Sequence, residues 1–171
     1  EKYTSILAKS IQEKLPTEYD AILFSYHGIP ERQITKNECK TICEEICPAL
    51  TENNQRCYKA QCHQSSRLLA QELLLSENQY STAFQSRLGR TPWIKPYTDE
   101  QLIKLAASGI KKLVVVCPSF VADCLETLEE IGIRAKQQWQ ALGGEQLVIV
   151  PSMNAHKLWV KAIIEMTHHK I

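Results

Sequence analysis

A chain of 171 residues is long enough to form one well-buried domain, and this length does not require a second. Hydrophobic residues make up 44% of the chain, charged residues make up 23%, and the formal net charge is +1, which is typical of a soluble globular protein. This composition argues against nucleic acid or an anionic membrane as the main partner, and we expect neither a transmembrane segment of ~20 apolar residues nor a secretory signal peptide.

Helical and strand patterns alternate along the chain. Apolar residues spaced three or four apart predict helices, and short apolar runs bounded by glycine or proline predict buried strands. In chain order these are a helix over 1–15, a strand over 21–24, a helix over 59–75, a strand over 81–85, a helix over 99–107, a strand over 113–117, helices within 119–131 and 133–142, a strand over 146–150 and a helix over 155–166. Such alternation predicts an α/β fold, a four-stranded parallel sheet with helices on both faces. Because no repeat or linker divides the chain, we expect a single domain over 1–171.

A histidine stands at the end of the first predicted strand. Gly28 and Pro30 stop the strand, which leaves His27 at its carboxyl end. In open α/β sheets, ligands bind in the crevice beyond these strand ends. A lone histidine there is more often a hydrogen-bonded structural residue, so its position alone does not separate a functional role from a structural one.

Three acidic residues follow the third predicted strand. At helical spacing Asp123, Glu126 and Glu130 share one face of the predicted helix within 119–131. One interpretation is an ordinary amphipathic helix with a solvated acidic side. The other is that this acidic face opens toward the same crevice as His27, where an imidazole and carboxylates together bind a cation and move protons.

Five of the seven cysteines fall within residues 36–62, namely Cys39, Cys43, Cys47, Cys57 and Cys62. An odd count without an export signal argues against a secreted disulfide framework. Clustered thiols in an intracellular enzyme favour metal ligation, and four thiolates suit either zinc or an iron–sulfur cluster. Reduced thiols with no shared role are the alternative.

Three segments together resemble the signatures of one family, the ferrochelatases. They are FSYHGIP (24–30), FQSRLGRTPWIKPYTDE (84–100) and SFVADCLETLEEI (119–131), and they occur in the family's order at similar spacings. The resemblance spans roughly residues 1–167, but it covers only the second, C-terminal half of a family member. It implies a Rossmann-like domain that holds a porphyrin together with a similar N-terminal half of the same enzyme.

The resemblance also implies a reaction and its residues. Ferrochelatases are lyases of haem biosynthesis that insert Fe²⁺ into a porphyrin while two pyrrole protons leave, so porphyrin and ferrous iron are the expected substrates. By position in the motifs, His27 is the catalytic histidine and Glu126 its acidic partner, while Asp123 and Glu130 match further acidic positions that bind the substrate metal. The motifs do not decide which of His27 and Glu126 takes the protons.

The cysteine segment resembles a bacterial subset of the family that carries a 2Fe–2S cluster, since RCYKAQC (56–62) is similar to a stretch of those enzymes. The resemblance implies Cys39, Cys43, Cys47 and Cys57 as cluster ligands, with Cys62 as the runner-up, and a structural or sensing role. The thiol spacing fits neither paired zinc knuckles nor the common ferredoxin patterns. Because the spacing does not choose between them, the resemblance favours the cluster, and zinc is the alternative cofactor.

Two other functions remain open at this stage. The chain is alternatively a metal- or cluster-binding module without turnover of its own, or a chelatase that inserts Co²⁺ or Ni²⁺ into another tetrapyrrole. The remaining histidines fall outside the motifs, which favours iron. We expect a cytoplasmic protein whose isolated chain is inactive without the N-terminal half, and peripheral membrane contact through that half is compatible with the resemblance. Protoporphyrin and a carboxylate-richer precursor remain alternative substrates.

Overall fold

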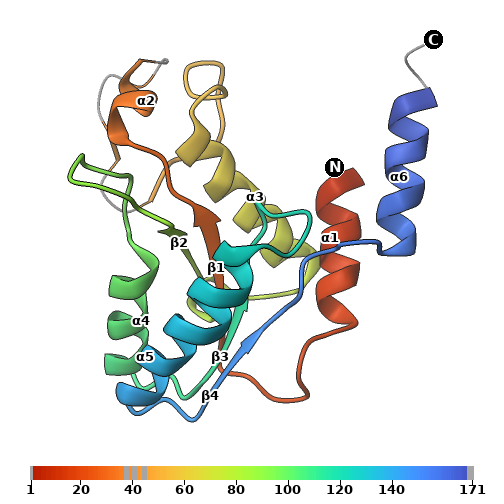
Figure 1. The fold of residues 1–171 in the computed structure, drawn as a ribbon. Helices are drawn as coiled ribbons and strands as arrows, with labels where there is room; N and C mark the ends of the chain where they lie inside the picture. Colours follow the sequence, from red (N-terminus) through yellow and green to blue (C-terminus); the bar gives the residue numbers. More distant parts are fainter. Residues whose placement is uncertain (1, 37–38, 40–41, 44–45, 169–171) are drawn as a thin grey trace.

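The computed structural model describes residues 2–36, 39, 42–43 and 46–168 (Figure 1). Within these residues one sheet of four parallel strands has the order β2-β1-β3-β4. The strands are β1 (Ala21–His27), β2 (Tyr80–Gln85), β3 (Lys112–Val116) and β4 (Gln146–Ile149). The predicted four-stranded parallel sheet is thus confirmed.

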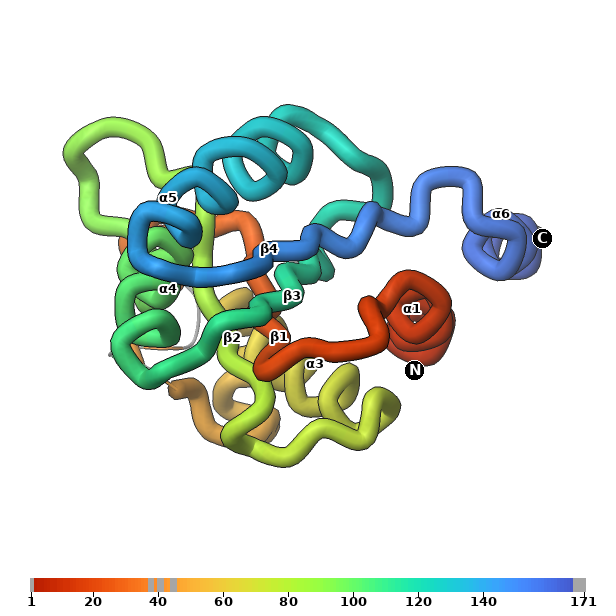
Figure 2. Tube along the Cα trace, turned by 90° about the horizontal axis from the view of Figure 1, so that it is seen from below, coloured from red at the N-terminus to blue at the C-terminus, as the bar shows by residue number. Residues whose placement is uncertain are grey.

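Helices cover both faces of this sheet, as Figure 2 shows from below. In chain order they are α1 (Lys2–Gln12), α2 (Glu31–Thr35), α3 (Tyr58–Glu72), the 3₁₀ turn η1 (Glu77–Gln79), α4 (Thr98–Ala107), the π-helix η2 (Glu126–Ala135), α5 (Lys136–Ala141) and α6 (Lys157–His168). Helices α1 and α3 lie on one face, and α4, η2 and α5 lie on the other. The α/β architecture is therefore that expected from the sequence.

Alternate residues of the strands build two cores. In β1, Ile22 and Phe24 pack into the core beneath α1 and α3, whereas Leu23 packs into the core beneath α4 and α5, and all three are fully buried. Because both faces of a covered parallel sheet are apolar, its strands lose the alternation of half-exposed strands. Burying each such side chain stabilises the fold by roughly 1.5–3 kcal/mol.

The strand order creates a topological switch point at the carboxyl ends of β1 and β3. After β1 the chain turns to β2 on one side, and after β2 it returns to β3 on the other side of β1. In doubly wound sheets the ligand crevice lies at this point, because the connections leave the two neighbouring strand ends in opposite directions. His27 ends β1, and the loop that follows β3 lies beside it.

The predicted acidic helix differs from the observed one. Residues 121–124 are irregular, the helix is a π-helix from Glu126, and it continues into α5 without a break at Gly132. The Thr127 hydroxyl accepts a hydrogen bond from the Cys124 amide at 3.0 Å, at the point where the loop passes into the helix. Asp123 therefore lies outside the helix, off the face predicted for it.

Helix α6 lies at the edge of the molecule, beyond α1 (Figures 1 and 2). Trp159 packs edge-on against Tyr3 with ring centroids 5.6 Å apart, and Ala162 is buried. Much of the predicted apolar stripe is exposed, because α6 packs mainly against α1; the exposed members are Leu158, Ile163 and Met166. No helix in the described ranges has both the length and the apolar character required to span a membrane.

Candidate functional site

The imidazole of His27 is held in one tautomer. Its Nδ1 lies 2.6 Å from the Gly28 carbonyl oxygen, which can only accept a hydrogen bond. In the neutral ring Nδ1 therefore carries the proton and Nε2 carries the lone pair. The half-exposed ring lies between two aromatic side chains, with centroids 6.3 Å from Trp93 and 6.0 Å from Phe120. Nε2 is thus prepared to accept a proton or to coordinate a cation.

Three other elements fix the backbone around His27. The His27 amide donates to the Ser119 hydroxyl at 2.9 Å, in the loop after β3. The His27 carbonyl accepts the Tyr58 hydroxyl from the start of α3 at 2.7 Å. The next amide, that of Gly28, donates to the Gln85 carbonyl of β2 at 2.8 Å. Because the strand end is anchored from both sides, the imidazole has a defined position.

Glu126 begins η2 and lies within electrostatic reach of His27. A hydrogen bond with the Cys124 thiol is the largest cause that lowers the pKa of the Glu126 carboxyl, and the positive charge of His27, when its ring is protonated, lowers it further. The carboxylate is therefore ionised at neutral pH. His27 and Glu126 are thus close enough to influence each other electrostatically, and their shared catalytic site stays a prediction.

Asp123 is surrounded by hydrogen-bond donors. Its Oδ1 accepts the Ser152 amide at 3.0 Å and the Thr127 hydroxyl at 3.2 Å, and its Oδ2 accepts the Asn154 side chain at 2.7 Å. Partial burial raises the pKa of the Asp123 carboxyl, but these hydrogen bonds outweigh it and hold the pKa below its usual range. These contacts join the loop before η2 to the connection between β4 and α6. The predicted metal-binding role of Asp123 is untested.

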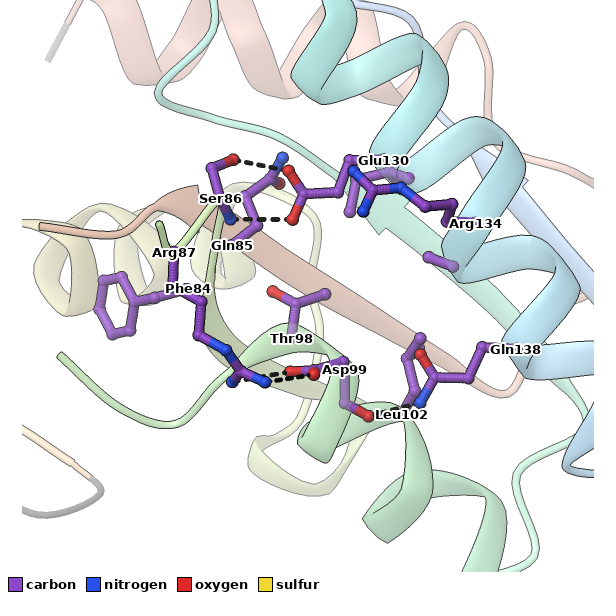
Figure 3. Close-up of a pocket in the computed structure, with 12 residues that line it drawn as sticks. Phe84, Gln85, Ser86, Arg87, Thr98, Asp99, Leu102, Glu130, Arg134 and Gln138 are labelled. Atoms are coloured by element: carbon purple, nitrogen blue, oxygen red, sulfur yellow. Dashed lines mark hydrogen bonds and ion pairs between the residues drawn. The ribbon is translucent and has the colours of Figure 1, made fainter. Parts of the chain in front are cut away.

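Glu130 lies in a separate cavity of about 330 Å³ beside β2, α4 and η2 (Figure 3). Both carboxylate oxygens accept hydrogen bonds from Ser86, at 2.8 Å from its amide and 2.7 Å from its hydroxyl. Ser86 adopts a left-handed φ of 68°, which points both donors at the carboxylate. Arg87 and Asp99 form an ion pair at 2.7 Å across the same cavity. His27 and Glu126 are absent from its lining, so the three predicted acidic residues do not form one continuous face.

The cysteines of the 36–62 segment gather on the core beneath α3. Cys47 and Cys57 are buried, and Cys39 and Cys43 are half-buried against the same core. Burial and the adjacent Cys43 thiol raise the pKa of Cys47 to about 12. All seven cysteines are described, and none forms a disulfide. Among the described residues, no three ligand side chains are close enough together to hold a metal ion.

Two basic side chains of α3 bind the backbone of this cysteine segment. The buried side chain of Lys59 donates to the Cys43 carbonyl. Arg67 donates to the carbonyls of Cys47 and Pro48, each at 3.1 Å. Burial lowers the pKa of the Lys59 ammonium, but the neighbouring thiols of Cys47, Cys43 and Cys57 act to raise it. Four soft donors beside a buried basic group fit a thiolate-ligated centre in chemical type.

Cys62 has a different environment from the other four thiols. Its buried thiol interacts with the Tyr58 side chain, and burial raises its pKa to about 12. Tyr58 in turn binds the His27 carbonyl. Cys62 therefore lies toward the His27 side of α3, and its place as the runner-up ligand stays a prediction.

Several residues of the site were not predicted individually. Ser119 and Phe120 lie in the third quoted segment, and Gln85 and Trp93 lie in the second, but no spacing rule assigns them to the surroundings of His27. Gln85 was the most accessible to prediction, because a polar residue ends a strand that pairs with β1. Tyr58 follows Cys57 directly, and only the packing of α3 reveals its contact with His27.

Comparison with known proteins identifies relatives over nearly all of the chain. The family model described as Ferrochelatase matches residues 1–171. Ferrochelatase of Legionella pneumophila (strain Corby) is 62% identical over 150 residues, which cover 88% of this chain and 45% of that protein. Ferrochelatase of Coxiella burnetii (strain Dugway 5J108-111) is 55% identical over 166 residues, which cover 95% of this chain and 46% of that protein. The chain thus spans a little under half the length of these curated relatives. It belongs to the ferrochelatase family.

Proposed function

We propose that this chain is the catalytic half of an enzyme that inserts Fe²⁺ into a porphyrin in haem biosynthesis. The observation that carries the proposal is that His27 ends β1 at the topological switch point with the Nε2 lone pair of its neutral ring free of the Gly28 contact, within electrostatic reach of Glu126. An imidazole and an ionised carboxylate supply the two acceptors that metallation of a porphyrin requires. The enzyme is expected to act in the cytoplasm.

The reaction exchanges two protons for one metal ion. Two pyrrole N–H bonds break, both electron pairs stay on nitrogen, and Fe²⁺ binds to them. His27 Nε2 and the Glu126 carboxylate accept the leaving protons or guide the incoming Fe²⁺, and both tasks need an unprotonated group. Asp123 and Glu130 are further candidate ligands on the path of the metal, although both accept hydrogen bonds from the protein.

An apolar surface beside the catalytic pair supports a flat aromatic substrate. Three large apolar residues of the loop after β3 and the start of η2 are exposed, namely Val121, Leu125 and Leu128. Exposed apolar side chains that are grouped often mark a binding surface, whereas single exposed apolar residues need no such explanation. Together with Phe120 and Trp93 they offer one wall for a macrocycle that lies over His27.

The second wall is proposed to come from an N-terminal half of the same enzyme. The relatives are about twice as long as this chain, and a macrocycle held from one side is poorly oriented for reaction. We therefore assign iron insertion to the full-length enzyme, meaning this chain together with that half.

The test is to replace each member of the pair in the full-length enzyme. We expect His27→Ala and Glu126→Gln each to lower kcat for iron insertion by about 10²–10⁴-fold, the usual contribution of a positioned acid or base. Matched controls are His156→Ala, whose imidazole pairs with Glu13, and Glu129→Gln, on the same helix as Glu126. Near-normal turnover in a folded His27 or Glu126 variant rules out that residue as catalytic.

The cysteine segment is proposed to hold a 2Fe–2S cluster through Cys39, Cys43, Cys47 and Cys57. Support comes from the four thiols on one core and from the basic Lys59 beside them, which would offset the negative charge of bound thiolates. When bound, the cluster supplies a cross-link that stabilises the segment, or a sensor of iron or oxidant. Metal insertion transfers no electrons, so the cluster has no step in the reaction.

Metal analysis separates the candidates for this centre. We expect anaerobically purified protein to absorb visible light and to contain iron and acid-labile sulfide, and Cys47→Ser to lose both. Cys124→Ser, which changes a thiol outside the segment, should keep them. A colourless protein with stoichiometric zinc would keep the site and replace the cluster. Metal-free protein whose cysteine segment is equally protected from amide exchange would reject both the cluster and the zinc site.

A further inference from the structure

Gln85 is hydrogen-bonded to the residue after His27 and to the backbone of Glu126. It is the last residue of β2, it is 3% exposed, and it lies opposite His27 in the parallel register. Its backbone carbonyl accepts the Gly28 amide at 2.8 Å. Its side-chain Nε2 donates to the Glu126 carbonyl, also at 2.8 Å. One residue is therefore bonded to the backbone that follows His27 and to the backbone of Glu126 itself.

The orientation of the Gln85 amide follows from its partners. The Glu126 carbonyl can only accept, so Nε2 must face it, and Oε1 faces the opposite side. There Oε1 accepts the Ser25 hydroxyl at 2.7 Å and the Cys117 thiol at 3.5 Å. Since the one hydroxyl proton of Ser25 is used in this bond, Thr98 donates to the Ser25 oxygen at 2.7 Å. The side chain is thereby held by Ser25 of β1 and by Cys117 directly after β3, and Thr98 at the start of α4 supports Ser25.

We propose that Gln85 is a positioning residue that sets the Glu126 carboxylate relative to the His27 imidazole during iron insertion. This inference rests on the proposed function of the pair.

The need for such a residue arises from the local structure of η2. The loop over 121–124 is irregular, and the carboxylate of Asp123 attaches it to the connection after β4 through Ser152 and Asn154. The bond from Gln85 attaches the first residue of the helix directly to the sheet that carries His27. A displacement of about 1 Å in a reacting group can cost about 100-fold in rate, so the loss of this bond should affect turnover before it affects substrate binding.

The experiment compares substitutions of glutamine in the full-length enzyme. We expect Gln85→Met to lower kcat for iron insertion by at least tenfold while KM for the porphyrin stays within twofold. The matched control is Gln138→Met, because Gln138 also donates its Nε2 to a backbone carbonyl, that of Asp99, at 2.8 Å. Gln138→Met should leave kcat unchanged.

A second pair of variants removes the effect of misfolding. Gln85→Met leaves the Ser25 hydroxyl without its acceptor, and a buried unpaired hydroxyl costs about 1–3 kcal/mol. The triple variant Gln85→Met, Ser25→Ala and Thr98→Val removes both hydroxyls of this hydrogen-bonded chain, so it should fold more stably than Gln85→Met with equally low kcat. Ser25→Ala with Thr98→Val keeps the bonds of Gln85 to the Glu126 carbonyl and to the Cys117 thiol, so it should lower kcat less than Gln85→Met does.

The outcomes distinguish this inference from the proposed function. If His27→Ala and Glu126→Gln lose activity while the folded Gln85 variants keep kcat, the positioning role is wrong and the catalytic pair stands. An equal fall of kcat in Gln138→Met also overturns it, since the loss of a glutamine–backbone hydrogen bond elsewhere would then have the same effect. If His27→Ala and Glu126→Gln both remain active, the proposed function fails first.

Discussion

At the scale of single residues, the site depends on backbone groups as much as on side chains. The Gly28 carbonyl selects the His27 tautomer, and the Gly28 amide binds β2. A Cβ at Gly28 would lie 3.0 Å from the Gln85 carbonyl oxygen and 3.2 Å from Cε3 of Trp93. Glycine is required here for close approach, because β1, β2 and the Trp93 ring meet at this position.

Gly28→Ala should therefore destabilise the protein by roughly 1–3 kcal/mol, the usual cost of overpacking, and should lower iron insertion by displacing Trp93 from His27. Urea unfolding and the enzyme assay measure the two effects. Gly132→Ala is the matched control, because the nearest atom to its new Cβ lies 3.5 Å away, an ordinary contact. Equal stability of the two variants would contradict the expectation.

The Asp123 carboxyl provides a prediction about pH. Its pKa is below the unfolded value of about 3.9 because Asn154, Ser152 and Thr127 bond the ionised form. A lowered folded pKa contributes stability that is fully present above the unfolded pKa and is lost as pH falls through the folded pKa. The stability difference between the wild type and Asp123→Asn should thus shrink below about pH 4. Unfolding curves from pH 6 to pH 2.5 measure it, and a constant difference over that range would speak against this account.

At the scale of elements, the start of η2 combines a catalytic candidate with exposed apolar side chains. Leu125 is 78% exposed directly before Glu126, and Leu128 is 57% exposed one turn later. An exposed leucine contributes little to folding, so we expect these side chains to be part of the proposed porphyrin wall.

Leu125→Ser should leave thermal stability nearly unchanged and should raise KM for the porphyrin several-fold in the full-length enzyme. The physical reason is the loss of apolar area that the macrocycle buries on binding. Leu74→Ser is the control, because Leu74 is 90% exposed just after α3, away from the end of the sheet that carries His27. If both variants bind porphyrin alike, the surface around Leu125 is not the proposed wall.

The cysteine segment depends on α3 for its attachment. Arg67→Met removes two hydrogen bonds to the carbonyls of Cys47 and Pro48, so amide exchange over 46–50 should become faster. Arg87→Met, which breaks the ion pair with Asp99 beside α4, should leave exchange in that stretch unchanged. Unaltered exchange in the Arg67 variant would show that other contacts hold the segment.

At the scale of the whole molecule, two cores on one sheet give this chain the means to fold independently. Each face of the sheet has its own set of fully buried side chains, which include Phe24 on one face and Trp139 on the other. The proposed site at His27 nevertheless requires a second wall, which we assign to an N-terminal half. We therefore expect this chain to fold by itself, whereas iron insertion requires the full-length enzyme.

The isolated chain should unfold cooperatively in urea but show no iron insertion. Adding the N-terminal half, fused or in trans, should restore turnover because the second wall then orients the porphyrin. The measurement is the rate of metalloporphyrin formation per folded chain. Appreciable iron insertion by the isolated chain would show that catalysis does not require the second wall.

The sequence by itself determined the alternation of elements and the strand that carries His27. Short apolar runs and helical spacing are local properties, so they survive without knowledge of the tertiary contacts. The quoted segments also determined the family and brought His27 and Glu126 forward as partners. The helical spacing could not show that Asp123 lies outside η2, because hydrogen bonds from Ser152 and Asn154, which follow β4, hold Asp123 in the loop.

Only the tertiary structure decided which polar groups meet at the strand ends. Glu130 and Glu126 are four residues apart, yet Ser86 binds one and Gln85 binds the backbone of the other. The same folding brings Tyr58 of α3 to the His27 carbonyl across 31 positions. Such pairings depend on strand order and register, which set long-range distances that no local spacing contains.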